Sequence, residues 1–288
     1  MIHGVTDEDE YSVSEPTLFS NPGDKPEENI MLEAVRLANL SGEVSSHSYE
    51  TWPSDKDGNF QDAVDDPVIA TLNLKSSIKP FYIYEPGTGI TPYGGGRREI
   101  DYRYSKFHSR NHWPVSQVPC DGRFVLAADR VTSSAITSVE PVKRQRENDN
   151  AWVGCFIMGL SDKPIEQIVP LARFWLHPPV IGTDSKAYAY EGFNRDERAY
   201  YFSKENELAN DLSLTVYACS EHPLVHPVFV IKKWGQYSLE IEQDGRKLEE
   251  GNDFTYSVRR SLDSKDLIIW FNLSTQDDIH LNLTAGQF

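Results

Sequence analysis

Cysteine and methionine are scarce in this sequence, and long hydrophobic runs are missing from it. Three cysteines and three methionines occur among 288 residues. No CxxC pair and no disulfide-rich spacing is present, which excludes a small disulfide scaffold. No window approaches the roughly 18 uninterrupted apolar residues that a membrane span needs. The first residues, MIHGVTDEDEYS, have neither a basic n-region nor an apolar h-region. No secretory signal is therefore predicted, and the compartment stays open.

Basic residues are also few for the number of acidic ones. Lysine and arginine total 28, aspartate and glutamate total 44, and the net charge is −16. Such an excess repels nucleic acid and anionic membranes at long range, so neither is expected as a partner. Apolar types make up 39% and aromatic types 11% of the chain, which predicts a folded protein with one large or two ordinary domains.

Most of the chain carries the pattern of short β-strands. Runs rich in Val, Ile, Thr, Tyr, Phe and Trp are separated by Gly, Pro, Asn and Asp, which is typical of an antiparallel sandwich. The clearest hairpin is SLEIEQDGRKLEE, where Asp244 and Gly245 suit a tight turn. The runs are VIATLNLK, KPFYIYEPG, RFVLAADR, AWVGCFIMGL, AYYFS, LSLTVYACS, PVFVIKKW, YSLEIEQ, FTYSVRR, DLIIWFNLS and IHLNLTA.

One segment near the N-terminus predicts a helix. In GDKPEENIMLEAVRLANLSG, Asp24 can act as N-cap, Pro26 falls in the first turn and Gly42 ends the segment. A strand within Met31–Leu40 is the alternative. The predicted fold is all-β: a large antiparallel β-sandwich of the supersandwich kind, with one short N-terminal helix.

Composition suggests where the chain divides. Residues 1–25 read as an acidic N-terminal tail and residues 26–288 as the β-sandwich region. The polar segment EPVKRQRENDN predicts either a boundary near residues 140–150 or a long hairpin loop. A second candidate boundary lies at residues 178–185.

A locally basic stretch runs from Arg97 to Arg110, where five basic and two acidic residues give a balance of +3. Gly94, Gly95 and Gly96 precede an arginine pair, and a glycine run of this kind lets backbone N–H groups approach an anion. Aromatic rings beside cationic donors suit a sugar that bears a negative group. The candidate substrate-binding residues are Arg97, Arg98, Arg110, Asn111 and Trp113.

The same region contains the residue types for β-elimination on a uronate polymer. That reaction needs a cation to neutralise the carboxylate, a base for the C5 proton and an acid for the leaving oxygen. The candidate catalytic residues are His108, His112 and Tyr104. The alternative is a solvated hairpin whose arginines pair with neighbouring carboxylates. A zinc peptidase is not predicted, because HSRNH lacks the catalytic glutamate of that motif.

A second candidate site is a calcium loop in SDKDGNFQDAVDD. Asp55, Asp57, Asn59 and Asp66 occupy the first, third, fifth and twelfth places of such a loop. Phe60 stands where the turn glycine belongs, so a polar turn is the alternative. No other cofactor is required by any motif.

Two cysteines and two histidines elsewhere in the chain are predicted to have structural roles. Cys155 and Cys219 follow apolar strand-like runs, which predicts buried thiols. His222 and His226 each precede a proline, which predicts rigid turns around the start of a strand.

The aromatic, turn-rich pattern resembles the β-sandwich portion of polysaccharide lyases over roughly residues 68–288. The stretches that carry the likeness are KPFYIYEPG, NHWPVSQVPCDGR and FVIKKWGQYSLEIEQDGRKL. The resemblance implies an acidic polysaccharide or oligosaccharide as partner and a helical domain upstream of the sandwich. The expected function is recognition of a uronate-containing polysaccharide, either as a lyase or part of one, or as a non-catalytic carbohydrate-binding or domain-supporting module.

Overall fold

A computed structural model describes part of the chain in full and further strands by their backbone alone. Side chains are described for residues 36–46, 64–71, 77–83, 157–183, 185–206, 208–209, 211–235, 238–260 and 264–285. The chain divides into two compact units, residues 1–169 and residues 170–288. This division lies between the two boundaries that composition suggested, at residues 140–150 and at residues 178–185.

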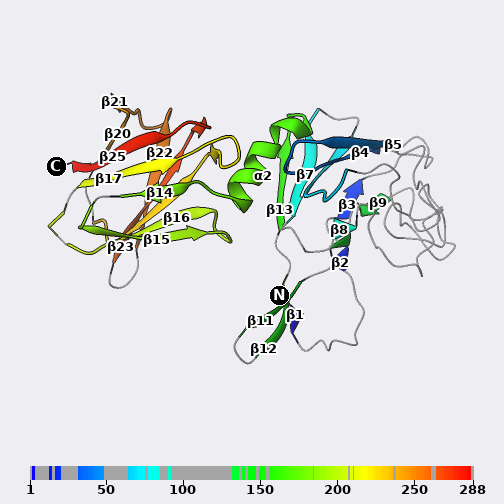
Figure 1. Cartoon of the computed structure of the whole chain (residues 1–288), viewed down its shortest axis with the longest axis horizontal. Coiled ribbons are helices and arrows are strands. Elements are labelled where there is room, and N and C mark those ends of the chain that lie inside the picture. Colours follow the sequence, from blue (N-terminus) through cyan, green and yellow to red (C-terminus); the bar gives the residue numbers. More distant parts are fainter. Residues whose placement is uncertain are drawn as a thin grey trace. The chain divides into compact units, whose positions relative to one another are not determined.

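The N-terminal unit contains a five-stranded antiparallel sheet with the strand order β13-β7-β6-β4-β5 (Figure 1). Its centre is apolar on both sides: Ile69, Ala70, Tyr82 and Ile83 are all at most 3% exposed. The strands are β4 (Leu32–Ala38), β5 (Val44–Ser48), β6 (Ile69–Leu74), β7 (Lys79–Tyr84) and β13 (Phe156–Ser161).

Smaller sheets complete the described strands of this unit. The segment at residues 140–150 contributes β11 and β12, which pair with each other as a hairpin. The strands are β1 (Ile2–His3), β2 (Val13–Ser14), β3 (Thr17–Ser20), β8 (Ile90–Thr91), β9 (Thr132–Ala135), β10 (Ser138–Val139), β11 (Val142–Arg146) and β12 (Asp149–Val153).

The predicted N-terminal helix is wrong over its apolar part. Leu32–Ala38 forms strand β4, which pairs with β5 on one side and β6 on the other. Leu37 and Ala38 are adjacent and both fully buried, a pattern that a central strand satisfies on its two faces. The alternative of a strand within Met31–Leu40 is confirmed. Gly42, expected to end a helix, lies instead in the β4–β5 connection with φ of 92°.

The described helices lie near the middle of the chain. A 3-10 turn, η4 (Ile165–Gln167), leads into α2 (Val169–Leu176). Pro170 is tolerated in the first turn because its missing N–H would have no helical partner there. Two prolines after His177 prevent continuation. No helix in the described part of the chain has the length and hydropathy that a membrane crossing requires.

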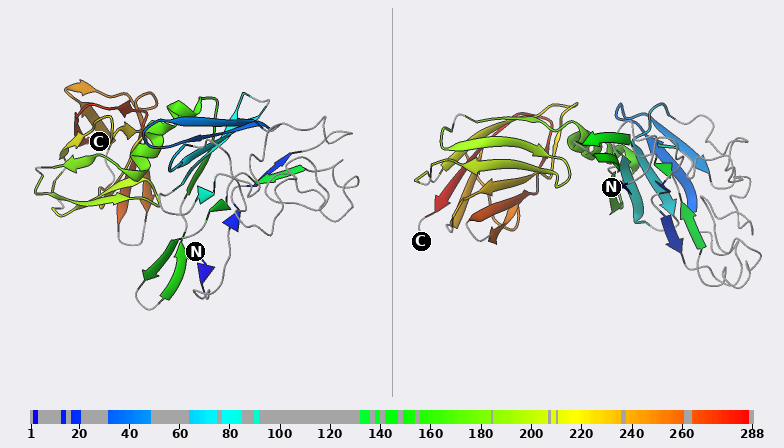
Figure 2. Two further views of the ribbon diagram at one scale, coloured as in Figure 1. Left: turned by 45° about the vertical axis from the view of Figure 1, so that its right-hand side comes forward. Right: turned by 90° about the horizontal axis from the view of Figure 1, so that it is seen from below.

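The C-terminal unit is a sandwich of two five-stranded sheets that lie face to face (Figures 1 and 2). The first sheet has the order β14-β17-β25-β20-β21. Its strands are β14 (Val180–Gly182), β17 (Asp211–Tyr217), β25 (Ile279–Gly286), β20 (Ser238–Gln243) and β21 (Arg246–Lys247). The second sheet has the order β15-β16-β19-β23-β22. Its strands are β15 (Tyr188–Asn194), β16 (Ala199–Lys204), β19 (Val228–Lys232), β23 (Lys265–Phe271) and β22 (Phe254–Arg260). A short pair, β18 (Leu224–Val225) and β24 (Ser274–Thr275), lies beside them. Within the second sheet β16 and β19 run parallel, and the other described pairs are antiparallel.

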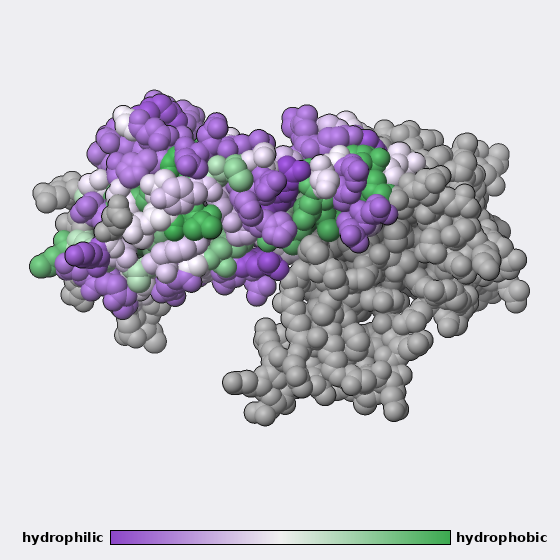
Figure 3. All heavy atoms as spheres, viewed as in Figure 1, coloured by the Kyte–Doolittle hydropathy of each residue, from purple (hydrophilic) through white to green (hydrophobic). Residues whose placement is uncertain are grey.

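The core fills the space between these two sheets, while hydrophilic residues cover much of the described surface that Figure 3 presents. Inward residues from the first sheet, such as Leu214 and Leu281, meet inward aromatics from the second, such as Phe202 and Phe229. Tyr200 and Phe229 make an edge-to-face contact with ring centroids 5.4 Å apart, a favourable aromatic geometry. The Tyr200 hydroxyl donates to the Pro179 carbonyl at 2.9 Å, so this polar group is satisfied in the core.

The hairpin predicted at Asp244-Gly245 is confirmed. Both residues have positive φ, 50° and 81°, and Gln243 pairs with Arg246 directly across the turn. These are the features of a two-residue turn whose twist matches the flanking strands. The predicted all-β antiparallel sandwich is likewise confirmed, with the short α-helix at Val169–Leu176 in place of the N-terminal one.

Candidate functional site

The candidate site lies on the outer face of the sheet β15-β16-β19-β23-β22, the face turned away from the core. Successive residues of a strand point to opposite faces. On β16, Tyr200 and Phe202 enter the core, so Tyr201 lies on the outer face between them. On β19, Phe229 and Ile231 enter the core, so Val230 and Lys232 also lie on the outer face.

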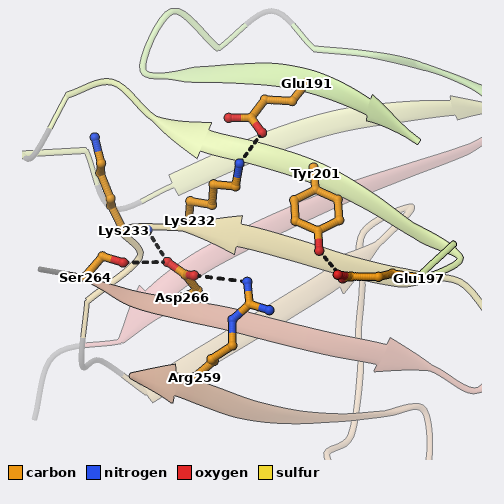
Figure 4. A network of polar contacts seen from close by, with 8 residues as sticks. All are labelled: Glu191, Glu197, Tyr201, Lys232, Lys233, Arg259, Ser264 and Asp266. Atoms are coloured by element: carbon orange, nitrogen blue, oxygen red, sulfur yellow. Dashed lines mark hydrogen bonds and ion pairs between the residues drawn. The ribbon is translucent and has the colours of Figure 1, made fainter. Parts of the chain in front are cut away.

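Tyr201 forms a flat aromatic surface on this face. It pairs directly with Val230, and Val230 is only 2% exposed although it points away from the core. Side chains on the outer face must therefore cover it. Figure 4 shows the Tyr201 ring broadside, with its hydroxyl directed to Glu197. The Tyr201 side chain is partly exposed on this face.

The Tyr201 hydroxyl acts as a hydrogen-bond donor at neutral pH. It donates to the Glu197 carboxylate. Burial raises the pKa of the Tyr201 phenol, and the hydrogen bond to Glu197 raises it further. The Arg259 guanidinium also interacts with this phenol. Since β22 is three strands away from β16, both side chains must lean over β19 and β23.

Lys232 and Glu191 form an ion pair, and the Lys232 ammonium lies over the Tyr201 ring. The Lys232 Nζ lies 2.5 Å from Glu191 Oε2 and 5.3 Å from the centroid of the Tyr201 ring. Glu191 is the extra residue of a β-bulge between Tyr190 and Gly192, and Gly192 has φ of 108°, which favours glycine. The bulge therefore aims Glu191 over the sheet toward Lys232, across β16.

This pair is weak in energetic terms. The Lys232 and Glu191 side chains are 38% and 35% exposed. Exposed pairs of this kind contribute about 0.2–1 kcal/mol to stability. A ligand that offers hydrogen bonds to either group can therefore take the place of its partner at small cost.

A surface depression of about 300 Å³ lies next to this pair. We call it the Tyr201 depression; it is lined by Glu191, Gly192, Phe193, Asn194, Tyr201 and Lys232. Its wall offers an ammonium and an amide N–H as donors, and carboxylate and amide oxygens as acceptors. Because Gly192 has no side chain, the backbone at the bulge is open toward the depression.

A second polar group lies on the neighbouring strands of the same face. The Asp266 carboxylate accepts from the Lys233 backbone N–H at 3.1 Å, from the Ser264 hydroxyl at 3.1 Å and from Arg259 at 3.3 Å (Figure 4). Partial burial opposes ionisation of Asp266, but these three donors outweigh it and hold its pKa below the ordinary value. The pKa of Arg259 is raised because it donates to Asp266. This network links β22 and β23, which form one edge of the outer face.

The lowered pKa of Asp266 predicts a specific acid dependence. A carboxyl whose folded pKa lies below its unfolded value stabilises the fold above the unfolded pKa and loses that contribution as pH falls through the folded pKa. We expect Asp266→Asn to lower the free energy of unfolding by about 2 kcal/mol at pH 7, because hydrogen bonds to a buried charge are lost.

Urea unfolding of the full chain across a pH series checks this expectation. The difference between wild type and Asp266→Asn should shrink between about pH 5 and pH 2. A difference that stays constant throughout this range would show that the Asp266 carboxylate is not the source of the effect.

The formal charges of the Tyr201 region cancel. The lining of the depression contains one carboxylate, Glu191, and one ammonium, Lys232. The whole chain, by contrast, carries −16. The region is therefore electrically balanced and rich in both donors and acceptors. It suits an uncharged ligand with hydroxyl groups, since each hydroxyl both donates and accepts.

The sequence-predicted site residues lie almost wholly outside the described residues. This holds for the candidate catalytic residues His108, His112 and Tyr104, for the candidate substrate-binding residues Arg97, Arg98, Arg110, Asn111 and Trp113, and for Asp55, Asp57 and Asn59 of the candidate calcium loop. These assignments stay predictions. Asp66 is described: it is exposed and has φ of 47°. Among the described residues, no group of three or more His, Cys, Asp or Glu side chains could hold a metal ion.

Two smaller predictions have different outcomes. Cys219 was expected to be buried, but it is exposed with a free thiol, because β17 ends at Tyr217 and Cys219 falls in the connection that follows. His222 and His226 do flank the short strand β18 as expected. His226 also stacks on Trp270, with ring centroids 5.8 Å apart and planes at 15°.

Sequence reasoning missed the residues of the Tyr201 depression. AYYFS was recognised as a strand, but no face was assigned to its middle tyrosine. The period of two did carry the signal, since Tyr201 alternates with the core residues Tyr200 and Phe202. No sequence signal could bring Glu191 and Lys232 together, because they are 41 residues apart and meet only through the sheet order.

Comparison with known proteins gives no further assignment. The chain matches no protein-family model, no curated protein and no solved structure.

Proposed function

We propose that this protein recognises carbohydrate and that its C-terminal unit is a non-catalytic carbohydrate-binding module. The observation that carries the proposal is the Tyr201 ring on an outer sheet face, which lines a 300 Å³ depression together with mixed donors and acceptors. The apolar face of a pyranose ring packs on an aromatic ring, while its hydroxyls bond to the rim. A few placed polar groups beside an apolar surface are what orient a small ligand.

The polar groups favour a sugar over other ligands. Nucleic acid is disfavoured by the charge of −16. A strongly anionic ligand is less favoured, because the carboxylates of Glu191 and Asp266 lie beside Lys232 and Arg259 and would repel a negative group. The balanced site favours an uncharged polysaccharide in the C-terminal unit. Cleavage of a uronate polymer stays a prediction that depends on His108, His112 and Tyr104.

Affinity electrophoresis of the full chain tests the proposed function. Native gels would contain a neutral glucan, mannan or xylan, or a uronate polymer, with a polymer-free gel as reference. Retarded migration in a neutral polysaccharide is the expected result. Unchanged migration in every gel would refute carbohydrate recognition. A rise in ultraviolet absorbance of the uronate solution would add an eliminase activity, because β-elimination leaves an unsaturated product.

Lys232 provides a second test of the same site. We expect Lys232→Met to weaken binding of the retained polysaccharide about tenfold, because a charged donor to a sugar hydroxyl is worth about 1.5 kcal/mol. The matched control is Lys247→Met. Lys247 also pairs with a glutamate, Glu240, at 2.9 Å, but it lies on the other sheet. Equal losses in the two variants would contradict a site at Lys232.

A further inference from the structure

We propose that the ligand is a linear glycan chain, and that it runs diagonally across the outer face from Tyr201 to a second aromatic contact at Trp270. This inference rests on the proposed function and specifies its ligand: several linked sugar rings in place of a single terminal one. It follows from strand register, exposure and the residues between the two aromatic rings.

Strand register places Trp270 on the same face as Tyr201. Trp270 pairs with Val228 on β19, and Tyr201 pairs with Val230 on the same strand. Val228 and Val230 are two residues apart and therefore share a face. Paired residues across a ladder share a face as well. All four side chains thus belong to the outer face.

The spacing of the two aromatics exceeds one sugar ring. Tyr201 and Trp270 lie on strands that flank β19, and their register positions differ by two residues. Strand spacing and rise then put their Cα atoms about 12 Å apart. A short chain of linked rings is long enough to contact both positions.

Two partly exposed apolar residues lie between the two aromatics. Val228 and Ile268 occupy intervening outer positions, whereas Val230 is buried beneath the outer-face side chains. Beyond them on β22, the exposed residues Thr255 and Ser257 pair with Trp270 and Ile268. Sugar rings can lie over Val228 and Ile268, and their hydroxyls can reach the side-chain hydroxyls at this edge and the Tyr201 depression at the other end.

Trp270 is suited to such a contact. Its side chain is 39% exposed, which is high for the largest apolar residue type. His226 stacks on it at an interplanar angle of 15°, and this support limits the indole to one orientation. Because the Trp270 side chain is already held in one orientation, it loses little side-chain entropy when a ligand binds.

The test measures affinity against chain length with the full-length protein. The probes are the mono-, di-, tetra- and hexasaccharide of whichever neutral glucan, mannan or xylan retards the protein. We expect the tetrasaccharide to bind at least tenfold more tightly than the monosaccharide. Trp270→Ala should abolish this gain, and Trp270→Phe should restore part of it.

Two results would overturn the chain-binding proposal while leaving carbohydrate recognition intact. One is equal affinity for the mono- and tetrasaccharide. The other is a gain with chain length that persists in Trp270→Ala. Absence of binding to every polysaccharide and oligosaccharide would refute both proposals. Thermal unfolding of each variant, expected to match wild type because Trp270 lies outside the core, separates loss of contact from loss of fold.

Discussion

Tyr201→Ala is expected to weaken binding of the retained polysaccharide about 30-fold, or about 2 kcal/mol. The truncation removes the aromatic surface on which a sugar ring would lie. It also uncovers Val230, which is 2% exposed beneath the outer-face side chains. Affinity electrophoresis or calorimetry with the polysaccharide identified for the wild type measures the loss.

Two further variants separate the causes of that loss. Tyr201→Phe retains the ring and removes the hydrogen bond to Glu197, so it should retain most of the affinity if stacking dominates. Tyr217→Ala is the matched control, because Tyr217 is a 52% exposed tyrosine on the other sheet. A comparable loss in Tyr217→Ala, or full binding by Tyr201→Ala, would remove the Tyr201 face from consideration.

The largest expected effect on stability comes from Phe229→Ala. Phe229 is fully buried and contacts the rings of Tyr200, Phe202 and Phe271, at centroid distances from 5.2 to 5.8 Å. Removing it leaves a cavity at the centre of the sandwich, so we expect a loss of about 4 kcal/mol in the free energy of unfolding. Chemical denaturation of the full chain provides the measurement.

The neighbouring residue supplies the control. Val228 precedes Phe229 on the same strand but lies on the outer face, so Val228→Ala should cost about 1 kcal/mol or less. Phe229→Ala alters the inner face of β19, and Val228→Ala alters its outer face. The comparison therefore separates the two faces of one strand. Similar losses in both would mean that the two sheets do not enclose the core described here.

The strands of the C-terminal sandwich were predictable because their signals are local. Alternation in LSLTVY and SLEIEQ, and the Asp244-Gly245 turn, depend on residues within a few positions of one another. The helix expected from Asp24, Pro26 and Gly42 failed for the complementary reason. Local capping signals compete with the pairing of β4 between two other strands, and that pairing buries Leu37 and Ala38 completely.

By itself the sequence determined the fold class, the net charge of −16 and most strands of the C-terminal sandwich, since composition and a period of two are enough for these; β14 and β15 were not predicted. Tertiary structure alone decided which strands became neighbours. The order β15-β16-β19-β23-β22 brings Glu191 to Lys232 and sets Tyr201 and Trp270 on one face. Sheet order is a long-range property: it depends on how whole strands pair and bury their inner faces, and no local pattern of residues encodes it.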